Sequence, residues 1–203
     1  MIEDRMKFKM KWTITKDHTN LNLVEYAKQC DADDFIGGRY DPGKPGYFMT
    51  FEIANNVIIS SNNVITSALY IGEESINGWH PDNIIRLINN GVIIGADGED
   101  GEALDGNVST SGSHGGDAIV ATRVVSVYNR GIISAGSGGN GLSKNDPKIK
   151  PSKPPKDVTN KNELAKAGTP GSLSAGGPPG YTVFGNNVIF WGNVGEKYGT
   201  EKH

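Results

Sequence analysis

The feature that most constrains this chain is a unit that occurs twice, forty residues apart. It reads LINNGVIIGADGEDG at 87–101 and VYNRGIISAGSGGNG at 127–141. Each copy holds an apolar pair, an Asn, one further residue, a Gly and two branched apolar residues, and then continues into spaced glycines. A shorter form, Asn-x-(Gly)-Val/Ile-Ile, occurs loosely at 55–59, 62–65, 89–93, 129–133 and 186–190.

The repeated unit predicts a strand, a bend and a second strand. Asn and Gly tolerate positive φ, so the chain can turn between short strands without steric strain. The branched residues favour strands and can face inward. Units of this kind build a continuous core when they stack. Because the copies are unevenly spaced, we expect a mainly β, compact stack of short strands rather than a long regular solenoid.

The glycine runs add a second element to this prediction. Gly95, Gly98 and Gly101 are three residues apart, as are Gly138 and Gly141. Three residues per turn is the period of the polyproline-II conformation, which makes no internal hydrogen bonds. Gly is 28 of 203 residues, about twice average usage. We therefore expect polyglycine-II-like segments packed side by side, with a flexible linker as the alternative.

The remaining patterns place the other elements. Alternating residues at 7–17 predict a half-buried strand, and helical spacing at 19–30 predicts one short N-terminal helix capped by Thr19 or Asn20. Further strands are expected from branched and aromatic runs at 47–61, 65–73, 83–95, 118–121 and 124–128. We expect two domains, a β-rich N-terminal domain with the short helix at 1–86 and a glycine-rich tip domain at 87–203.

One segment of the tip domain differs in composition from the strands and glycine runs around it. Residues 142–167 hold seven lysines against three acids, with four prolines and almost no apolar residue to bury. This composition predicts a long exposed insertion. It is either a solvated loop or a cationic surface for an anionic partner. Its candidate contact residues are Lys148, Lys150, Lys153 and Lys156.

One further group of residues, together with Trp79, supplies the other candidate receptor contacts. The first glycine run carries an acidic cluster and is followed by a histidine; these residues are Asp97, Glu99, Asp100, Glu102 and His114. The cluster lacks the ligand order and the closing Glu of a calcium-binding EF-hand, which favours a solvated acidic loop.

The tryptophans are the large anchors of the chain. Trp12 and Trp191 lie on predicted strands and are expected in the core. Trp79 lies in the turn-like stretch INGWHPDN and is expected at the surface, where aromatic residues favour interfaces.

Several functional classes find no support. His18, His80, His114 and His203 do not lie at metal-ligand spacing, and the glycine runs lack the Lys-Ser/Thr of a phosphate loop. We therefore expect no cofactor, no metal and no catalysis.

Charge and hydropathy exclude further classes. A net charge of −3 gives no argument for nucleic acid, and no apolar run approaches the roughly 18 residues of a membrane span. The single Cys30 excludes an intrachain disulfide and is expected half-buried at a helix end. The charged N-terminus lacks the apolar core of a secretory signal.

Four parts of the sequence, in order, carry a family resemblance. They are the opening KWTITKDHTNLNLVEYAKQ, the two glycine-run units joined by the step Gly115–Ile119, and the ending PGYTVFGNNVIFWGNVGEKYG, with Asn186, Ile189, Trp191 and Gly192 at its key places. Together they resemble the glycine-rich tip region of tailed-phage adhesins. That region is shared by the distal tail-fibre adhesins of T-even-type phages and by the tip of lambda-type host-specificity proteins. The resemblance covers about 7–141 and 176–199.

The resemblance implies a β-rich base carrying polyglycine rods, with the loops between the rods touching the bacterium. The expected protein is a receptor-binding adhesin in the virion tail. Its partners would be a bacterial outer-membrane protein or surface glycan and other tail proteins. It would be a homotrimer, as on lambda-type fibres, or a single chain, as in T-even adhesins. We expect the contacts in the loops at 97–114 and 142–167.

The sequence departs from these relatives in two respects, and two alternatives stay open. Its glycine runs are short, with the Lys/Pro segment where relatives carry long glycine stretches, and it shows no long N-terminal attachment segment. The first alternative is a non-catalytic structural virion protein on the same fold. The second is a tailspike-like enzyme that cleaves polysaccharide with paired carboxylates, which is disfavoured because the acids lie mostly in loops.

Overall fold

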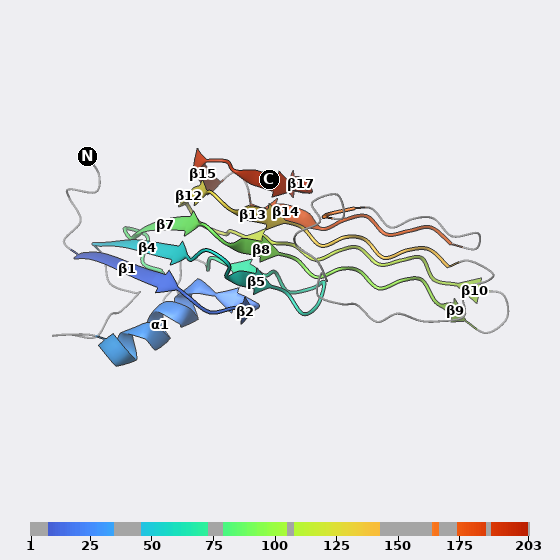
Figure 1. The fold of residues 1–203 in the computed structure, drawn as a ribbon, viewed down its shortest axis with the longest axis horizontal. Coiled ribbons are helices and arrows are strands. Elements are labelled where there is room, and N and C mark those ends of the chain that lie inside the picture. The colour runs from blue at the N-terminus through green and yellow to red at the C-terminus, as the bar shows by residue number, and fades with distance from the viewer. Residues whose placement is uncertain are drawn as a thin grey trace.

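Three five-stranded parallel sheets form a stack (Figure 1). This stack is called the base from here on, and it includes strands from both of the expected domains. The structure is a computed structural model, and it describes residues 8–34, 46–72, 79–104, 108–142, 164–166, 174–185 and 188–202. Sheet A contains β1 (Phe8–Ile14), β4 (Tyr47–Ile53), β7 (Ile84–Asn89), β12 (Val125–Asn129) and β15 (Ile189–Asn193). Sheet B contains β2 (His18–Thr19), β5 (Ile58–Ser60), β8 (Val92–Ile94), β13 (Ile132–Ser134) and β16 (Glu196–Tyr198). Sheet C contains β3 (Leu21–Asn22), β6 (Leu69–Tyr70), β11 (Ile119–Val120), β14 (Tyr181–Phe184) and β17 (Thr200–Lys202).

The chain visits sheets A, B and C in turn, so that each circuit is one coil of a short three-sided stack. Strands of successive coils pair in parallel, for example Phe51 with Leu87 and Leu87 with Val127. These three side chains are fully buried, because alternate residues of each sheet A strand point inward. The mainly β stack predicted from the sequence is confirmed.

The repeated Asn marks one corner of this stack. Asn89 and Asn129 are both fully buried at the bend between sheets A and B. Nδ2 of Asn89 donates to Oδ1 of Asn129 at 2.8 Å, and Nδ2 of Asn129 donates to the carbonyls of Val194 and Glu196 at 2.9 and 3.0 Å. The asparagines therefore satisfy polar groups that the bend would otherwise bury without partners.

The five repeat copies do not occupy one corner. The copies at 55–59, 89–93 and 129–133 each bend from sheet A to sheet B, whereas 62–65 lies between sheets B and C. The copy at 186–190 leads into β15, and its first two residues lie outside the described residues.

The helix α1 (Leu23–Asp34) follows the first coil and lies beside β1 and β2 (Figure 1). Leu23, Val24 and Ala27 on one side of it are buried in the core. Its cap is Asn22, whose Oδ1 accepts from the N–H groups of Val24 at 2.9 Å and Glu25 at 3.4 Å. The helix was predicted correctly, but its capping residue was not, because β3 carries the chain two residues further before the helix begins.

Two excursions leave the stack at the corner between sheets B and C. One joins β8 to β11 and the other joins β13 to β14. Each runs out and back, giving four glycine-rich segments: rod 1 (95–101), rod 2 (110–116), rod 3 (135–141) and rod 4 (174–180). Figure 1 shows them side by side, extending away from the stack. The hairpin of β9 (Ala103–Leu104) and β10 (Val108–Ser109) lies at their far end.

Other predictions fall as follows. The expected strand at 65–73 is reduced to β6, and that at 47–61 is split by a turn in which Asn56 has φ 65°. Trp12 and Trp191 pack against the core as expected. Cys30 is half-buried within α1. The boundary drawn between 86 and 87 falls inside β7, which pairs with both β4 and β12.

Across the described ranges, no helix combines the length and apolar character needed to cross a membrane.

Candidate receptor-contacting surface

The four rods are joined by hydrogen bonds between backbone groups at every third residue. From rod 1, the N–H groups of Gly95, Gly98 and Gly101 donate to carbonyls of the strand-and-rod segment 134–140, at 3.0, 2.8 and 2.7 Å. This is the three-residue period read from the sequence, and it is the bonding expected of polyglycine-II rods. The packed arrangement, rather than a flexible linker, is the one observed.

Rod 3 is bonded to the three other rods. It donates to rod 2 from Gly136 and Gly139, at 2.9 Å in both cases. It accepts from rod 4, where Gly177 and Gly180 donate at 2.7 and 3.0 Å. Rod 2 is also bonded to the three others, because Gly116 donates to Ala96 of rod 1 at 2.7 Å and Gly115 donates to Pro178 of rod 4 at 3.0 Å. Rods 2 and 3 therefore share the centre of the bundle.

Glycine is required in this bundle by close backbone approach. A Cβ on Gly139 would lie against the carbonyl of Glu99, and one on Gly136 would lie against the carbonyl of Ala96, both well inside van der Waals contact. The obstacle is backbone on a neighbouring rod, so no side-chain movement can relieve it.

Two of the predicted contact residues brace the rods. Oδ1 of Asp97 accepts from the N–H of Ser137 at 2.8 Å, and Oδ1 of Asp100 accepts from the N–H of Asn140 at 2.6 Å. Burial raises the pKa of the Asp97 carboxyl, and the hydrogen bonds from Ser137 oppose that shift. Both aspartates therefore join rod 1 to rod 3.

The other predicted residues on rods 1 and 2 are more accessible. Glu99 and His114 are exposed, and Glu102 is partly exposed. The N–H of Glu102 donates to Oγ1 of Thr110 at 2.7 Å, and the N–H of Thr110 donates back to the Glu102 carbonyl at 2.8 Å. This pair closes rods 1 and 2 beside the β9–β10 hairpin, so Glu102 stands near the far end.

Lys148, Lys150, Lys153 and Lys156 lie outside the described residues. The chain is described up to 142 and again at 164–166, where Leu164 is buried. The N–H of Gly138 donates to the Lys166 carbonyl at 2.8 Å, so the described residues 164–166 are bonded to rod 3.

Trp79 is not at the surface, and the expectation that it is exposed is wrong. Its side chain is fully buried, its indole N–H donates to the Ile71 carbonyl at 2.6 Å, and its ring lies 6.0 Å from that of Phe51. Its polar, turn-like sequence neighbours gave no sign that Trp79 is a core residue.

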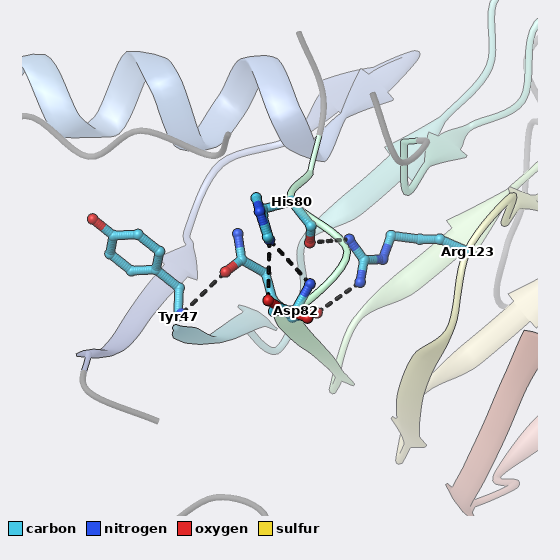
Figure 2. A network of polar contacts seen from close by, with 5 residues as sticks. Tyr47, His80, Asp82 and Arg123 are labelled. Atoms are coloured by element: carbon cyan, nitrogen blue, oxygen red, sulfur yellow. Dashed lines mark hydrogen bonds and ion pairs between the residues drawn. The ribbon is translucent and has the colours of Figure 1, made fainter. Parts of the chain in front are cut away.

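Beside Trp79, a buried arginine holds the segment that precedes β7 (Figure 2). Arg123, between β11 and β12, donates to the carbonyls of His80 at 3.2 Å and Asn83 at 2.6 Å. Oδ1 of Asn83 in turn accepts from the N–H of Tyr47 at 3.0 Å. This network is not predictable from the sequence, because nothing in the local pattern distinguishes Arg123 from a surface arginine.

The sheets of the base carry hydrogen-bonded rods with the β9–β10 hairpin at their far end (Figure 1). This architecture displays surface segments on a packed scaffold, as binding proteins do. The family model described as phage tail fibre adhesin Gp38 matches residues 9–154, more than two thirds of the chain, and the chain belongs to that family. It is a non-catalytic, receptor-binding adhesin of the phage tail. Neither the curated proteins nor the solved structures gave a match.

Proposed function

We propose that this adhesin contacts its receptor through the segments 97–114 and 142–167. The observation that supports this is that both excursions leave the base at the same corner and that their described rods are bonded to one another. The described rods are therefore held as one bundle that extends away from the base (Figure 1).

Stiff presentation favours binding because little conformational freedom is lost when the loops meet a receptor. In this proposal Glu99, Glu102 and His114 contribute contacts from rods 1 and 2. Asp97 and Asp100 fix the rods that carry them. The lysines at 148, 150, 153 and 156 add a region of opposite charge. Neighbouring regions of opposite sign steer and select a partner with complementary charge.

The receptor proposed is a bacterial outer-membrane protein or a surface glycan. The base would attach to other tail proteins, either as a homotrimer or as a single chain. The lysine-rich loop predicts that binding weakens as ionic strength rises, because salt screens exposed charges over about 10 Å at 0.1 M.

The test is binding of the fluorescently labelled chain to candidate host cells. The key variant replaces 143–163 with a short Gly-Ser linker, and circular dichroism checks that the β stack is retained. Thr13→Ala, at an exposed position on β1 of the base, is the control. Saturable binding by the intact chain, lost in the linker variant and kept in the control, supports the proposal. Full binding by the linker variant contradicts a role for the 142–167 loop. No binding by the folded intact chain to any candidate host favours attachment within the virion.

A further inference from the structure

A polar pocket lies at the N-terminal end of the stack, apart from the far end of the rods. It has a volume of about 220 Å³ and opens to solvent between the β2–β3 corner and the first turns of α1. Pockets for drug-sized ligands span roughly 300–1,000 Å³, so this one suits a smaller group. The side chains that define it are His18, Asn20, Asn22, Glu25, Tyr26 and Gln29.

One polar stripe of the chain forms the helical wall. Asn22, Glu25, Tyr26 and Gln29 follow the i, i+3, i+4, i+7 spacing that places residues on one face of a helix. The other side of α1 is buried in the core. The stripe is therefore fixed against the stack by packing that does not involve the pocket.

The opposite wall is held by a pair of asparagines. Asn20, with φ 53°, donates from its N–H to the Ser60 carbonyl at 2.8 Å and from Nδ2 to Oδ1 of Asn62 at 2.7 Å. The N–H of Asn62 donates back to Oδ1 of Asn20 at 3.3 Å. These bonds fix the corner in place, so the pocket is largely formed before a ligand arrives.

Two side-chain amides of the pocket have hydrogen-bonding groups without a partner among the described residues. Oδ1 of Asn22 is occupied by the helix cap, but its Nδ2 has no hydrogen-bond partner among the residues that the structure describes. The same holds, over those residues, for the side-chain amide of Gln29. An amide offers both donors and an acceptor, which matches a ligand whose groups both donate and accept.

The charge and ring content of the pocket narrow the ligand class. Its carboxylate, Glu25, is 3.0 Å from Nζ of Lys28, so the pocket carries little net charge to attract a phosphate or a cation. The Tyr26 ring meets the His18 ring edge-on, with centroids 5.5 Å apart. Burial raises the pKa of Tyr26 to about 12, with a further contribution from Cys30, so the phenol keeps its proton at neutral pH.

We propose that this pocket binds one sugar residue of a bacterial surface glycan. A sugar ring is a neutral group with several hydroxyls, each a donor and an acceptor, and with apolar C–H edges that pack on aromatic rings. Amides, a phenol and an imidazole around a small cavity match those features. The site would give the adhesin a second contact on its base. Its role in attachment depends on the proposed adhesin function, whereas sugar binding itself does not.

The experiment is NMR titration of the full, ¹⁵N-labelled chain with D-glucose, D-galactose, N-acetyl-D-glucosamine and L-rhamnose. Single sugar residues are expected to bind in the millimolar range. We expect at least one sugar to shift the amide signals of residues 18–29 saturably while leaving those of the rods unchanged. No saturable shift in residues 18–29 with any of the four sugars overturns the proposal.

Two variants separate sugar binding from folding. Asn22→Asp keeps the capping oxygen and removes only the Nδ2 donor, because Asp caps helices as well as Asn does. Gln29→Ala removes the unpaired amide from an exposed helix position. Each should weaken sugar binding at least tenfold with an unchanged melting temperature, while Ser111→Ala on rod 2 changes neither. Binding that survives both substitutions overturns the proposal.

The failure of this proposal is distinguishable from failure of the proposed function. Asn22→Asp and Gln29→Ala leave the 142–167 loop intact, and the linker replacement of 143–163 leaves the pocket intact. If sugar binding fails while cell binding still depends on the loop, only the pocket assignment is lost. If the loop is dispensable while the sugar shifts persist, only the tip assignment is lost.

Discussion

In both the base and the rod bundle, chain segments lie side by side. Burial of apolar side chains stabilises the base, whereas backbone hydrogen bonds stabilise the bundle. In the base, inward-pointing side chains such as Phe51 and Leu87 are fully buried, and apolar burial supplies the stability. In the rods, backbone groups of Gly136 and Gly139 bond neighbouring rods directly, and no space is left for a side chain at those positions.

Because of this difference, an adhesin can keep the packing of its rods while the residues in its loops change. The register of the rods is set mainly by backbone bonds, to which Asp97 and Asp100 add side-chain bonds between rods 1 and 3. The base tolerates volume-conserving exchanges between apolar residues, whereas the bundle tolerates no added methyl group where backbones meet. Mutations should therefore separate the two regions.

The largest effect is expected from truncating the centre of the base. Phe51→Ala removes a ring that stacks on Trp12 at 4.9 Å and meets Trp79 at 6.0 Å. We expect a loss of about 3–5 kcal/mol of unfolding free energy, measured by urea denaturation. Phe51→Leu should cost clearly less. A loss of less than about 1 kcal/mol for Phe51→Ala would contradict the claim that packing at this position stabilises the base.

The next effect is specific to the bundle. Gly139→Ala forces a methyl group against the Glu99 carbonyl and should cost about 1–3 kcal/mol or more locally. The amides of Gly139 and Gly177 should exchange faster with solvent, and host-cell binding should fall, while the β signal in circular dichroism is kept. Thr13→Ala, at an exposed position on β1, should change none of these. Unchanged exchange at Gly177 would show that the rods do not pack as described.

A smaller effect is expected at the buried asparagine corner. Asn129→Ala leaves the carbonyls of Val194 and Glu196 without their side-chain donor, at about 1–3 kcal/mol. Faster hydrogen exchange should appear first in β16, the strand that follows this corner. Arg130→Ala, at the exposed neighbouring position, serves as control. Loss confined to sheet C would contradict this assignment.

The smallest effect concerns the charge at Asp97. Its pKa is raised in the folded protein, so the folded state holds the proton more tightly than the unfolded chain does. The resulting stabilisation is complete below the unfolded pKa of about 3.9 and is lost as pH rises through the higher folded pKa. Asp97→Asn keeps the acceptor for Ser137 and should gain on the order of 0.5 kcal/mol at pH 7.

That gain should shrink as pH falls, because Asp97 then becomes neutral as well. Melting temperatures of the two proteins, compared from pH 7 to pH 4, would measure it. A gain that grows toward low pH would reverse the sign of the assigned shift.

The sequence predicted the parts of the fold that local chemistry controls. Asn beside Gly marked the bends, branched residues marked the strands, and the spacing of Gly95, Gly98 and Gly101 marked the rods. Those signals need no distant partner, and they also carried the family resemblance.

What the sequence could not supply were contacts between distant segments. Trp79 has turn-like neighbours, and only its packing on Phe51 shows that it is buried. Asp97 and Asp100 look solvated until Ser137 and Asn140 are placed beside them. The predicted loop lysines lie outside the described residues, so their assignment remains a proposal.

The most direct test of the account is hydrogen–deuterium exchange of the intact chain, free and bound to outer membranes of its host. The account predicts that binding slows exchange in 97–114 and 142–167 and leaves sheet A unchanged. Protection confined to sheet A, with exchange in both loops unaltered, would contradict the claim that the rods present the receptor-contacting surface.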